Sequence, residues 1–212
     1  MSAPLPTYDR RFRARLRARD ERAFERLVRD FERRIYSFCY RMLGCPEEAH
    51  DVAQDVFFAV FNALPRFRGE SKLSTWIYRI ATNHCRNRIA YLKRRHARRR
   101  KSLSEVHDGV LLSARAHGRA ATPLAHAEGR ELESHLRRWI RELDENQREF
   151  LVLRDIEGLT YEEIVAVTGS PLGTVKSRIH RARLELKRRL DVYQAAVSDE
   201  GVEPIQLTVA KV

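Results

Sequence analysis

The sequence has 212 residues, of which 41 are Lys or Arg and 29 are Asp or Glu, so the formal net charge is +12. Hydrophobic residues make up 43% of the chain, which excludes a disordered tail, and no apolar run approaches the roughly 20 residues that a membrane-spanning helix needs. No apolar segment of the kind found in a secretory signal follows the N-terminus, so we expect a cytoplasmic protein without membrane insertion. The positive charge favours a polyanionic partner, either nucleic acid or anionic lipid.

This charge is concentrated in three segments. Residues 1–22 hold seven arginines against three acids, residues 86–101 hold nine Lys or Arg and no acid, and residues 172–190 hold seven Lys or Arg against one acid. The remainder of the chain is therefore net acidic, and a polyanion is expected to meet these segments rather than the whole surface.

Helical periodicity predicts a compact N-terminal bundle. Apolar residues recur every three or four positions from Phe24 to Met42, from Ala49 to Leu64 and from Leu73 to Ile89, as in helices with one buried stripe. We expect the bundle to occupy residues 22–95 and to follow a basic arm at residues 1–21.

The rest of the chain divides into three parts. Residues 96–129 are rich in Arg, Ala, His, Ser and Gly and lose the apolar periodicity, so we expect a flexible linker. Residues 130–190 form a second helical unit, and residues 191–212 form a tail. The predicted fold class is therefore all-α, with two small helical domains joined by the linker.

The second unit has the pattern of a helix-turn-helix. Thr160 and Glu163 form a capping box that opens a short helix, and Ser170 with Pro171 predicts a longer basic helix ending near Leu190. A short helix, a turn with a glycine and a longer basic helix indicate a motif whose second helix enters the major groove of DNA.

The register of this second helix separates a core face from a groove face. The core face holds Val175, Ile179, Ala182 and Leu186. The opposite face presents Gly173, Ser177, His180 and Arg181 and is flanked by Thr174 and Lys176. The residues expected to contact base edges are Lys176, Ser177, His180 and Arg181. Contacts with phosphate or solvent are expected for Arg178, Arg183, Lys187, Arg188 and Arg189. A solvated basic helix is the alternative, but the caps, the turn and the register together favour DNA binding.

A second candidate surface begins at the third bundle helix. A polar loop over residues 67–76 feeds a helix that carries Trp76, Tyr78, Arg79, Asn83, Arg86, Asn87 and Arg88. Such residues suit single-stranded DNA, because bases stack on aromatic rings while cations follow the backbone. Taken alone, Trp76 is more often a core aromatic.

The second bundle helix is acidic. Between Met42 and Pro65 there is no Lys or Arg, and the acids are Glu47, Glu48, Asp51 and Asp55. In a positively charged protein this surface should avoid DNA, which favours docking to a basic protein partner. A merely solvated acidic face is the alternative.

The sequence gives no positive case for catalysis. Glu47 and His50 form a Glu-x-x-His step of the kind found in carboxylate-bridged metal bundles, but such sites need a second copy that is absent. Cys39, Cys45 and Cys85 form no CxxC pair. We therefore expect no enzyme, no cofactor and no metal, and keep a metal-dependent bundle enzyme as a third hypothesis.

Three blocks of this sequence resemble the bacterial extracytoplasmic-function (ECF, group IV) sigma factors of RNA polymerase. Residues 49–57 are similar to the family's D-x-x-Q-[ED]-x-F segment, residues 67–71 and 74–83 form the second block, and residues 157–164 and 173–183 form the third. The blocks occur in the family's order and spacing. The resemblance implies two domains, called sigma-2 and sigma-4.

The resemblance also implies a role for each block. In the family, the first block docks on the clamp helices of the polymerase's largest subunit, through positions that here are Asp51, Gln54, Asp55 and Phe57. Sigma-2 recognises and opens the minus-ten promoter element, through Phe67, Arg68, Gly69, Glu70, Ser71, Lys72, Trp76, Tyr78, Arg79, Asn83, Arg86 and Asn87. Sigma-4 binds the flap of the second-largest subunit and reads the minus-thirty-five element, through Thr174, Lys176, Ser177, Arg178, His180 and Arg181.

The sequence therefore predicts a sigma factor that directs core polymerase to specific promoters and helps to open the minus-ten element. Its expected partners are core RNA polymerase, promoter DNA in duplex and single-stranded form, and an anti-sigma factor. We expect it in the cytoplasm, associated with the nucleoid when bound to polymerase. A stand-alone helix-turn-helix regulator is the alternative, and would bind duplex DNA tightly without polymerase. The Arg-rich N-terminus, the basic run 93–101 and the tail receive no role.

Overall fold

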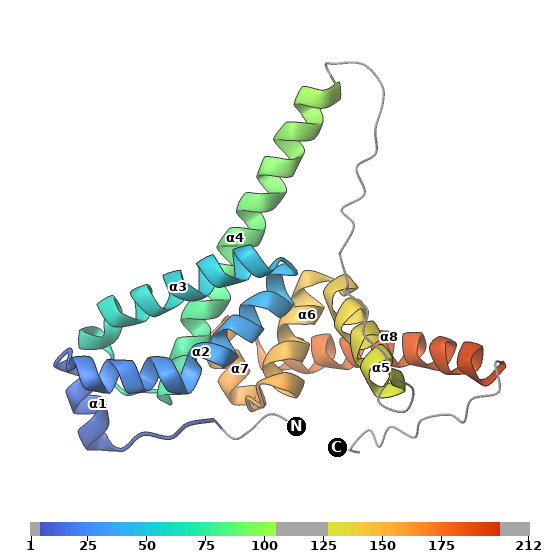
Figure 1. Ribbon diagram of the computed structural model, residues 1–212. Coiled ribbons are helices and arrows are strands. Elements are labelled where there is room, and N and C mark those ends of the chain that lie inside the picture. Colours follow the sequence, from blue (N-terminus) through green and yellow to red (C-terminus); the bar gives the residue numbers. More distant parts are fainter. Residues whose placement is uncertain (1–4, 105–126, 200–212) are drawn as a thin grey trace.

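The computed structural model describes residues 5–104 and 127–199, which form helices and no strand. The N-terminal unit consists of α1 (Arg10–Arg17), α2 (Glu21–Leu43), α3 (Pro46–Ala63), the 3-10 turn η1 (Leu64–Arg66) and α4 (Leu73–Ser104). The C-terminal unit consists of α5 (Ala127–Glu142), α6 (Glu145–Leu151), the π-helical turn η2 (Val152–Ile156), α7 (Tyr161–Thr168) and α8 (Leu172–Asp199) (Figure 1). The predicted all-α class with two helical units is confirmed.

Local sequence explains the main helix boundaries. Asp20 caps α2 by accepting a hydrogen bond from the backbone N–H of Ala23 at 2.9 Å. Gly44 ends α2 in the left-handed conformation at φ +74°, which a glycine adopts without a steric penalty. Thr160 and Glu163 form the predicted capping box at the start of α7. The helix-turn-helix therefore has the local signals that the sequence indicates.

The first helix lies within the segment predicted as a basic arm. Asp9 caps α1 by accepting a hydrogen bond from the Phe12 N–H at 2.6 Å. Phe12 and Leu16, four residues apart, are buried in the core of the N-terminal unit, and the Tyr8 ring stacks on Phe12 with centroids 4.6 Å apart. Two large apolar side chains in a helix of eight residues are too few to show periodicity, although they hold this helix on the bundle.

Three helices extend into segments predicted as linker or tail. α4 continues past residue 95 to Ser104, and α5 begins at Ala127. Residues 105–126, the remainder of the predicted linker, lie outside the described residues. α8 begins at Leu172, one residue later than predicted, and continues past residue 190 to Asp199. The Tyr193 ring lies 4.8 Å from His135 and 5.9 Å from Trp139, so the last turns of α8 pack against α5.

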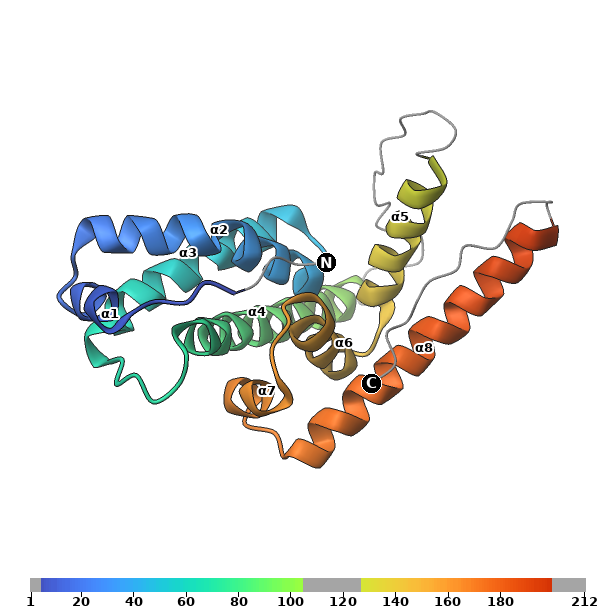
Figure 2. The same cartoon turned by 90° about the horizontal axis from the view of Figure 1, so that it is seen from below.

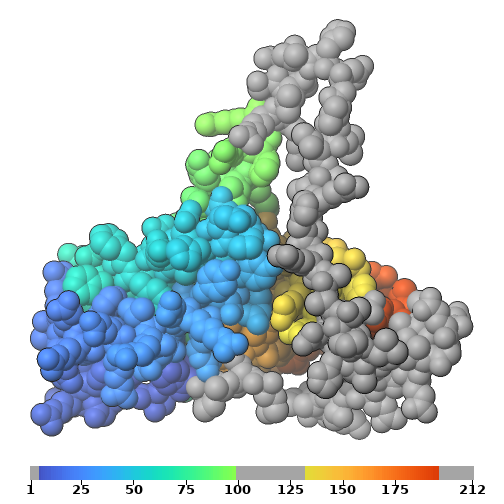
Figure 3. Space-filling model, in the orientation of Figure 1, coloured from blue at the N-terminus to red at the C-terminus, as the bar shows by residue number. Residues whose placement is uncertain are grey.

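The two units pack against each other. α4 contacts α7, and α2 contacts α5 and α6 (Figure 2). Buried side chains of both units belong to one continuous hydrophobic core, and Arg148 of α6 donates a hydrogen bond to the Met42 carbonyl oxygen at 2.9 Å. The space-filling view shows the surface of α2 directly against that of α5 (Figure 3). We call this packing the closed arrangement.

Candidate DNA and polymerase interfaces

The groove face of the helix-turn-helix is open to solvent. Val175, Ile179 and Ala182 are buried as the register predicts. The predicted base-reading residues on the opposite side are all exposed: Lys176, Ser177, His180 and Arg181. α8 packs on α6 and α7, and none of these four side chains is covered by the N-terminal unit. This face therefore presents hydrogen-bond donors and acceptors to solvent.

Other basic residues of α8 hold the C-terminal unit together. The half-buried Arg178 guanidinium lies 5.0 Å from the centre of the Phe150 ring, a cation–π contact. Arg183 forms a two-pronged ion pair with Asp155 of η2 at 2.5 and 2.9 Å, and this pairing raises the pKa of Arg183. These contacts fix the angle of α8, so Arg178, which the sequence assigns to DNA, also positions the recognition helix.

The predicted minus-ten residues of α4 divide between two faces of the helix. Arg79, Asn83 and Asn87 are spaced four residues apart and form one exposed stripe. Tyr78 and Arg86 lie on another face, directed toward the C-terminal unit. One helix therefore presents a free polar surface and a covered one.

Carboxylates of the C-terminal unit pair with the covered face. The Tyr78 hydroxyl donates a hydrogen bond to Glu157, and both side chains are buried. Arg86 donates two hydrogen bonds to Glu149, at 2.6 and 2.8 Å, and the Glu149 side chain is only 4% exposed. Burial raises the pKa of Glu157, and burial together with the Glu157 carboxylate raises the pKa of Tyr78.

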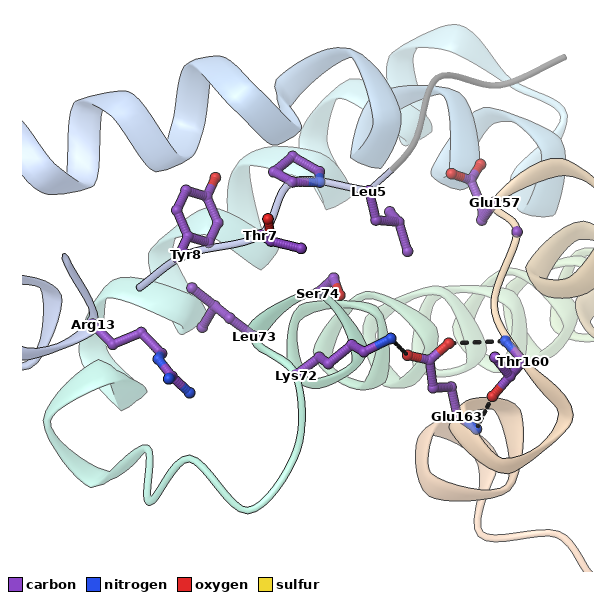
Figure 4. Close-up of a pocket in the computed structure, with 12 residues that line it drawn as sticks. Leu5, Thr7, Tyr8, Arg13, Lys72, Leu73, Ser74, Glu157, Thr160 and Glu163 are labelled. Atoms are coloured by element: carbon purple, nitrogen blue, oxygen red, sulfur yellow. Dashed lines mark hydrogen bonds and ion pairs between the residues drawn. The ribbon is translucent and has the colours of Figure 1, made fainter. Parts of the chain in front are cut away.

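Two more ion pairs, each with an exposed lysine, lie along the same boundary. Lys72 Nζ is 2.9 Å from Glu163 Oε1, and Lys93 Nζ is 2.7 Å from Glu145 Oε1. Burial opposes the charged form of Glu163, but a backbone hydrogen bond from Thr160 and the Lys72 ammonium outweigh it and lower its pKa. Lys72 and Glu163 also line a pocket of about 460 Å³ where the two units meet (Figure 4).

The loop at residues 67–72 is anchored at its first residue and exposed beyond it. Phe67 is buried and its ring centroid lies 5.0 Å from that of the half-buried Trp76. Gly69 has a φ of +78°, which gives the loop a turn that other residues adopt only with strain. Arg68, Gly69 and Glu70 are exposed. Phe67 therefore anchors the loop in the core, while residues 68–70 at the tip of the loop remain exposed to solvent.

The acidic helix α3 presents a continuous exposed stripe. Asp51, Gln54 and Asp55 are exposed, and Phe58, on the same side, is 71% exposed. Phe57, which the sequence assigns to polymerase binding, is half-buried and packs against the core. Sequence reasoning missed Phe58, although its spacing of four from Gln54 places it on the stripe.

The residues of the metal hypothesis do not meet. His50 and Glu47 are both exposed, and Glu47 accepts a hydrogen bond from the Cys45 thiol at 2.9 Å. Over residues 5–104 and 127–199, no group of three or more His, Cys, Asp or Glu side chains is placed to hold a metal ion. Within the same residues, no helix is long and apolar enough to cross a membrane.

Comparisons with known proteins identify both units. The model of Sigma-70 region 2 matches residues 27–99, and that of Sigma-70, region 4 matches residues 135–186. RNA polymerase sigma-H factor of Pseudomonas aeruginosa is 34% identical over 186 residues, which cover 86% of this chain and 93% of that protein. The chain belongs to the ECF family of RNA polymerase sigma factors. The ECF RNA polymerase sigma-E factor of Escherichia coli K12 is 35% identical over 173 residues, 80% of this chain and 87% of that protein.

Solved structures agree with this sigma-factor fold. The complex of CnrH with the cytosolic domain of CnrY matches with a TM-score of 0.61 and 27% identity, over 87% of this chain and 97% of that chain. The sigma factor RpoE of Bartonella quintana, in complex with the anti-sigma factor NepR, matches with a TM-score of 0.58 and 24% identity, over 80% and 97%.

Family membership decides between the functional hypotheses. The chain is a sigma factor, a non-enzymatic subunit that binds core RNA polymerase and promoter DNA in transcription initiation. The prediction that it is not an enzyme is confirmed by these relatives, and the stand-alone regulator is less well supported. As a sigma factor it works in the cytoplasm, where bacterial RNA polymerase transcribes DNA.

Proposed function

We propose that the N-terminal unit, as sigma-2, recognises and opens the minus-ten element, and that the C-terminal unit, as sigma-4, reads the minus-thirty-five element. The observation that carries this proposal is the exposed groove face of α8, where Lys176, Ser177, His180 and Arg181 stand opposite the buried Val175, Ile179 and Ala182. These residues would contact base edges, and Thr174 and Arg178 would support them.

The exposed stripe of α4 and the tip of the 67–72 loop would hold the unpaired minus-ten strand. Trp76 offers a ring for stacking, and Arg79, Asn83 and Asn87 offer charge and hydrogen bonds. Capture of unstacked bases would offset the few kcal/mol that unstacking costs.

The exposed stripe of α3 would dock on the clamp helices of the polymerase. Asp51, Gln54 and Asp55 supply charge and hydrogen bonds, and Phe58 adds an apolar side chain that solvent otherwise surrounds. Phe57 would support this helix from within the core. The outer surface of the C-terminal unit would bind the flap.

The closed arrangement has to open for both promoter elements to be read. Elements 25 base pairs apart are separated by about 85 Å along DNA at about 3.4 Å per pair. A compact chain of 212 residues has a radius of gyration of only about 17 Å. Opening would also free Lys72, Tyr78 and Arg86 from their carboxylate partners. The closed arrangement is then the resting form, and polymerase and promoter bind the open one.

An anti-sigma factor is a further proposed partner. The similar structure of the sigma factor RpoE was solved with the anti-sigma factor NepR bound. A partner that stabilised the closed arrangement would keep Tyr78 and Arg86 covered and so hold the sigma factor inactive. Association with the nucleoid would follow from binding to polymerase on DNA.

Run-off transcription from a random promoter library with purified core polymerase tests these assignments. The expected result is initiation that depends on core and selects a shared minus-ten and minus-thirty-five motif. Tight, specific binding to duplex DNA without core, and no core-dependent start site, would reject the assignments. The Phe58→Ala variant should bind core more weakly yet melt like the wild type, whereas Phe57→Ala should lower the melting temperature.

A further inference from the structure

The arginines of α1 form a surface that no role above uses. Five of the eight residues of this helix are arginines. Arg15 pairs with Asp20 at 2.9 Å, whereas Arg10, Arg11 and Arg17 are exposed and form no ion pair with any described residue. α1 is fixed to the bundle through Phe12 and Leu16, so these charges occupy a defined place rather than a mobile arm.

The helix lies beside the loop that is proposed to hold the unpaired strand. α1 packs against η1, the turn that leads into this loop. A Cβ atom built on Gly69 would be 4.0 Å from Arg13 Nη1, so the Arg13 guanidinium borders the loop itself. Figure 4 shows the Arg13 side chain extending from α1 toward the loop that precedes Lys72. Two segments far apart in the sequence thus form one basic edge.

The spacing of the arginines suits a nucleic-acid backbone. Arg10, Arg13 and Arg17 are three and four residues apart and therefore lie on one side of the helix. Seven residues at 1.5 Å each separate the first from the last by roughly 10 Å, so the three guanidinium groups can reach successive phosphates of one strand. Nearby, the exposed Arg66 continues the basic edge toward the loop, where Arg68 lies 3.9 Å from the Glu70 carboxylate.

We propose that the Arg10, Arg13 and Arg17 face of α1 binds the phosphates of the unpaired promoter strand just downstream of the minus-ten element. This inference rests on the proposed function of the 67–72 loop. Promoter DNA upstream of the minus-ten element is duplex, so the strand that leaves the loop unpaired runs downstream. The contact is to phosphate, so it adds affinity and salt dependence without reading sequence.

Binding of the reconstituted holoenzyme to two fork DNAs tests the proposal. Both forks carry the promoter found in the run-off experiment, and the unpaired strand ends at the minus-ten element in the short fork and about four nucleotides later in the long fork. The Arg10→Ala, Arg13→Ala, Arg17→Ala triple variant should bind the long fork about tenfold more weakly than the wild type. The magnitude of its salt slope should fall by about 2, at about 0.7 per lost phosphate contact. Affinity for the short fork should not change.

The matched control replaces the same three arginines by lysine. Phosphate binding needs positive charge rather than the planar guanidinium, so the lysine variant should retain the affinity for the long fork. Equal binding of the long fork by the wild type and the alanine variant would overturn the proposal, and so would equal losses of affinity on both forks. The proposal would also fail if the alanine variant bound core polymerase more weakly in the absence of DNA, to an extent that accounts for the loss. A wild-type protein that binds neither fork with core would instead reject the proposed function. Melting curves confirm that the variants fold, as expected for side chains at the surface.

Discussion

The two helices proposed to contact DNA differ in what covers them. The groove face of α8 is free, and the engaged arginines of α8, among them Arg178 and Arg183, bind within their own unit. α4 instead has a free stripe and a second face on which Tyr78 and Arg86 bind carboxylates of the other unit. Recognition of the minus-thirty-five element can therefore be preformed, whereas full use of the minus-ten surface depends on a change in how the units pack.

Under the proposed function, this difference would let the protein regulate its own DNA affinity. Glu145, Glu149, Glu157 and Glu163 place four acids along the face of α4, where they pair with Lys93, Arg86, Tyr78 and Lys72. These acids occupy cations and a hydroxyl that DNA could otherwise bind. A sigma factor without core then has less affinity for nonspecific DNA than its net charge of +12 suggests.

Loss of Arg86 should have the largest effect on the covered surface. Arg86→Ala leaves the Glu149 carboxylate buried without its partner, which should destabilise the closed arrangement by about 2 kcal/mol, less than for a fully buried pair because Arg86 itself is 40% exposed. Small-angle scattering should show a larger radius of gyration for this variant. Arg79→Ala, on the exposed stripe, is the control and should scatter like the wild type. Identical scattering of all three proteins would show that the Arg86 pair does not hold the units together.

Changes on the free surface should act on DNA and not on the packing of the units. Arg181→Ala should lower discrimination of the minus-thirty-five element by about 1 to 3 kcal/mol per lost base contact and leave scattering unchanged. Holoenzyme binding to matched and scrambled elements gives the measurement. Lys187→Ala, which removes an expected phosphate contact, should weaken binding to both sequences alike. An equal loss on both sequences for Arg181→Ala would reassign that residue to phosphate.

The buried carboxyl of Glu157 should make the closed arrangement sensitive to pH. Burial raises the pKa of Glu157, so the closed form holds this proton more tightly than the open form. The stability that the closed form gains from this proton is complete below the ordinary glutamate pKa, and it is lost as the pH rises through the raised pKa. Glu157→Gln keeps a hydrogen-bond acceptor for Tyr78 and has no charge to bury. At neutral pH the variant should be more stable than the wild type by about 1 kcal/mol, and at low pH the two should converge. Denaturant unfolding as a function of pH measures the difference, and parallel curves would exclude a titrating Glu157.

The exposed pair at the far end of the boundary should contribute least. Lys93 is 67% exposed and Glu145 35% exposed, so water and salt screen their attraction. Lys93→Ala should change the stability of the closed arrangement by no more than about 0.5 kcal/mol. Thermal melts at low and high salt measure this change in stability. A loss larger than this would mean that exposed ion pairs dominate the packing of the two units.

Sequence predicts the elements of this protein better than it predicts their surroundings. Capping by Thr160 and Glu163, and burial of Val175 and Ile179, follow from local chemistry and helical spacing, and both are present. The hydrogen bond of the Tyr78 hydroxyl could not be predicted, because its partner Glu157 lies 79 residues away on the other unit.

Two smaller differences between the sequence-based predictions and the structure also arise from tertiary packing. Phe57 and Phe58 are adjacent aromatics, and only the packing of the bundle decides which of them contacts the core. The helix over Arg10–Arg17 contains only two buried residues, Phe12 and Leu16, beside five arginines, so its charge conceals the short buried face that fixes it.

The closed arrangement is tested most directly by the distance between the two units with and without core polymerase. Double electron–electron resonance measures this distance between spin labels at two exposed positions, Asn62 near the end of α3 and Lys187 of α8. The labels are introduced in a Cys45→Ser background, in which the remaining cysteines, Cys39 and Cys85, are buried. The free protein should give one narrow distance distribution, and addition of core should shift it, because two elements about 85 Å apart along the DNA require the units to separate. A broad distribution in the free protein, or an unchanged distribution with core bound, would contradict the closed resting form.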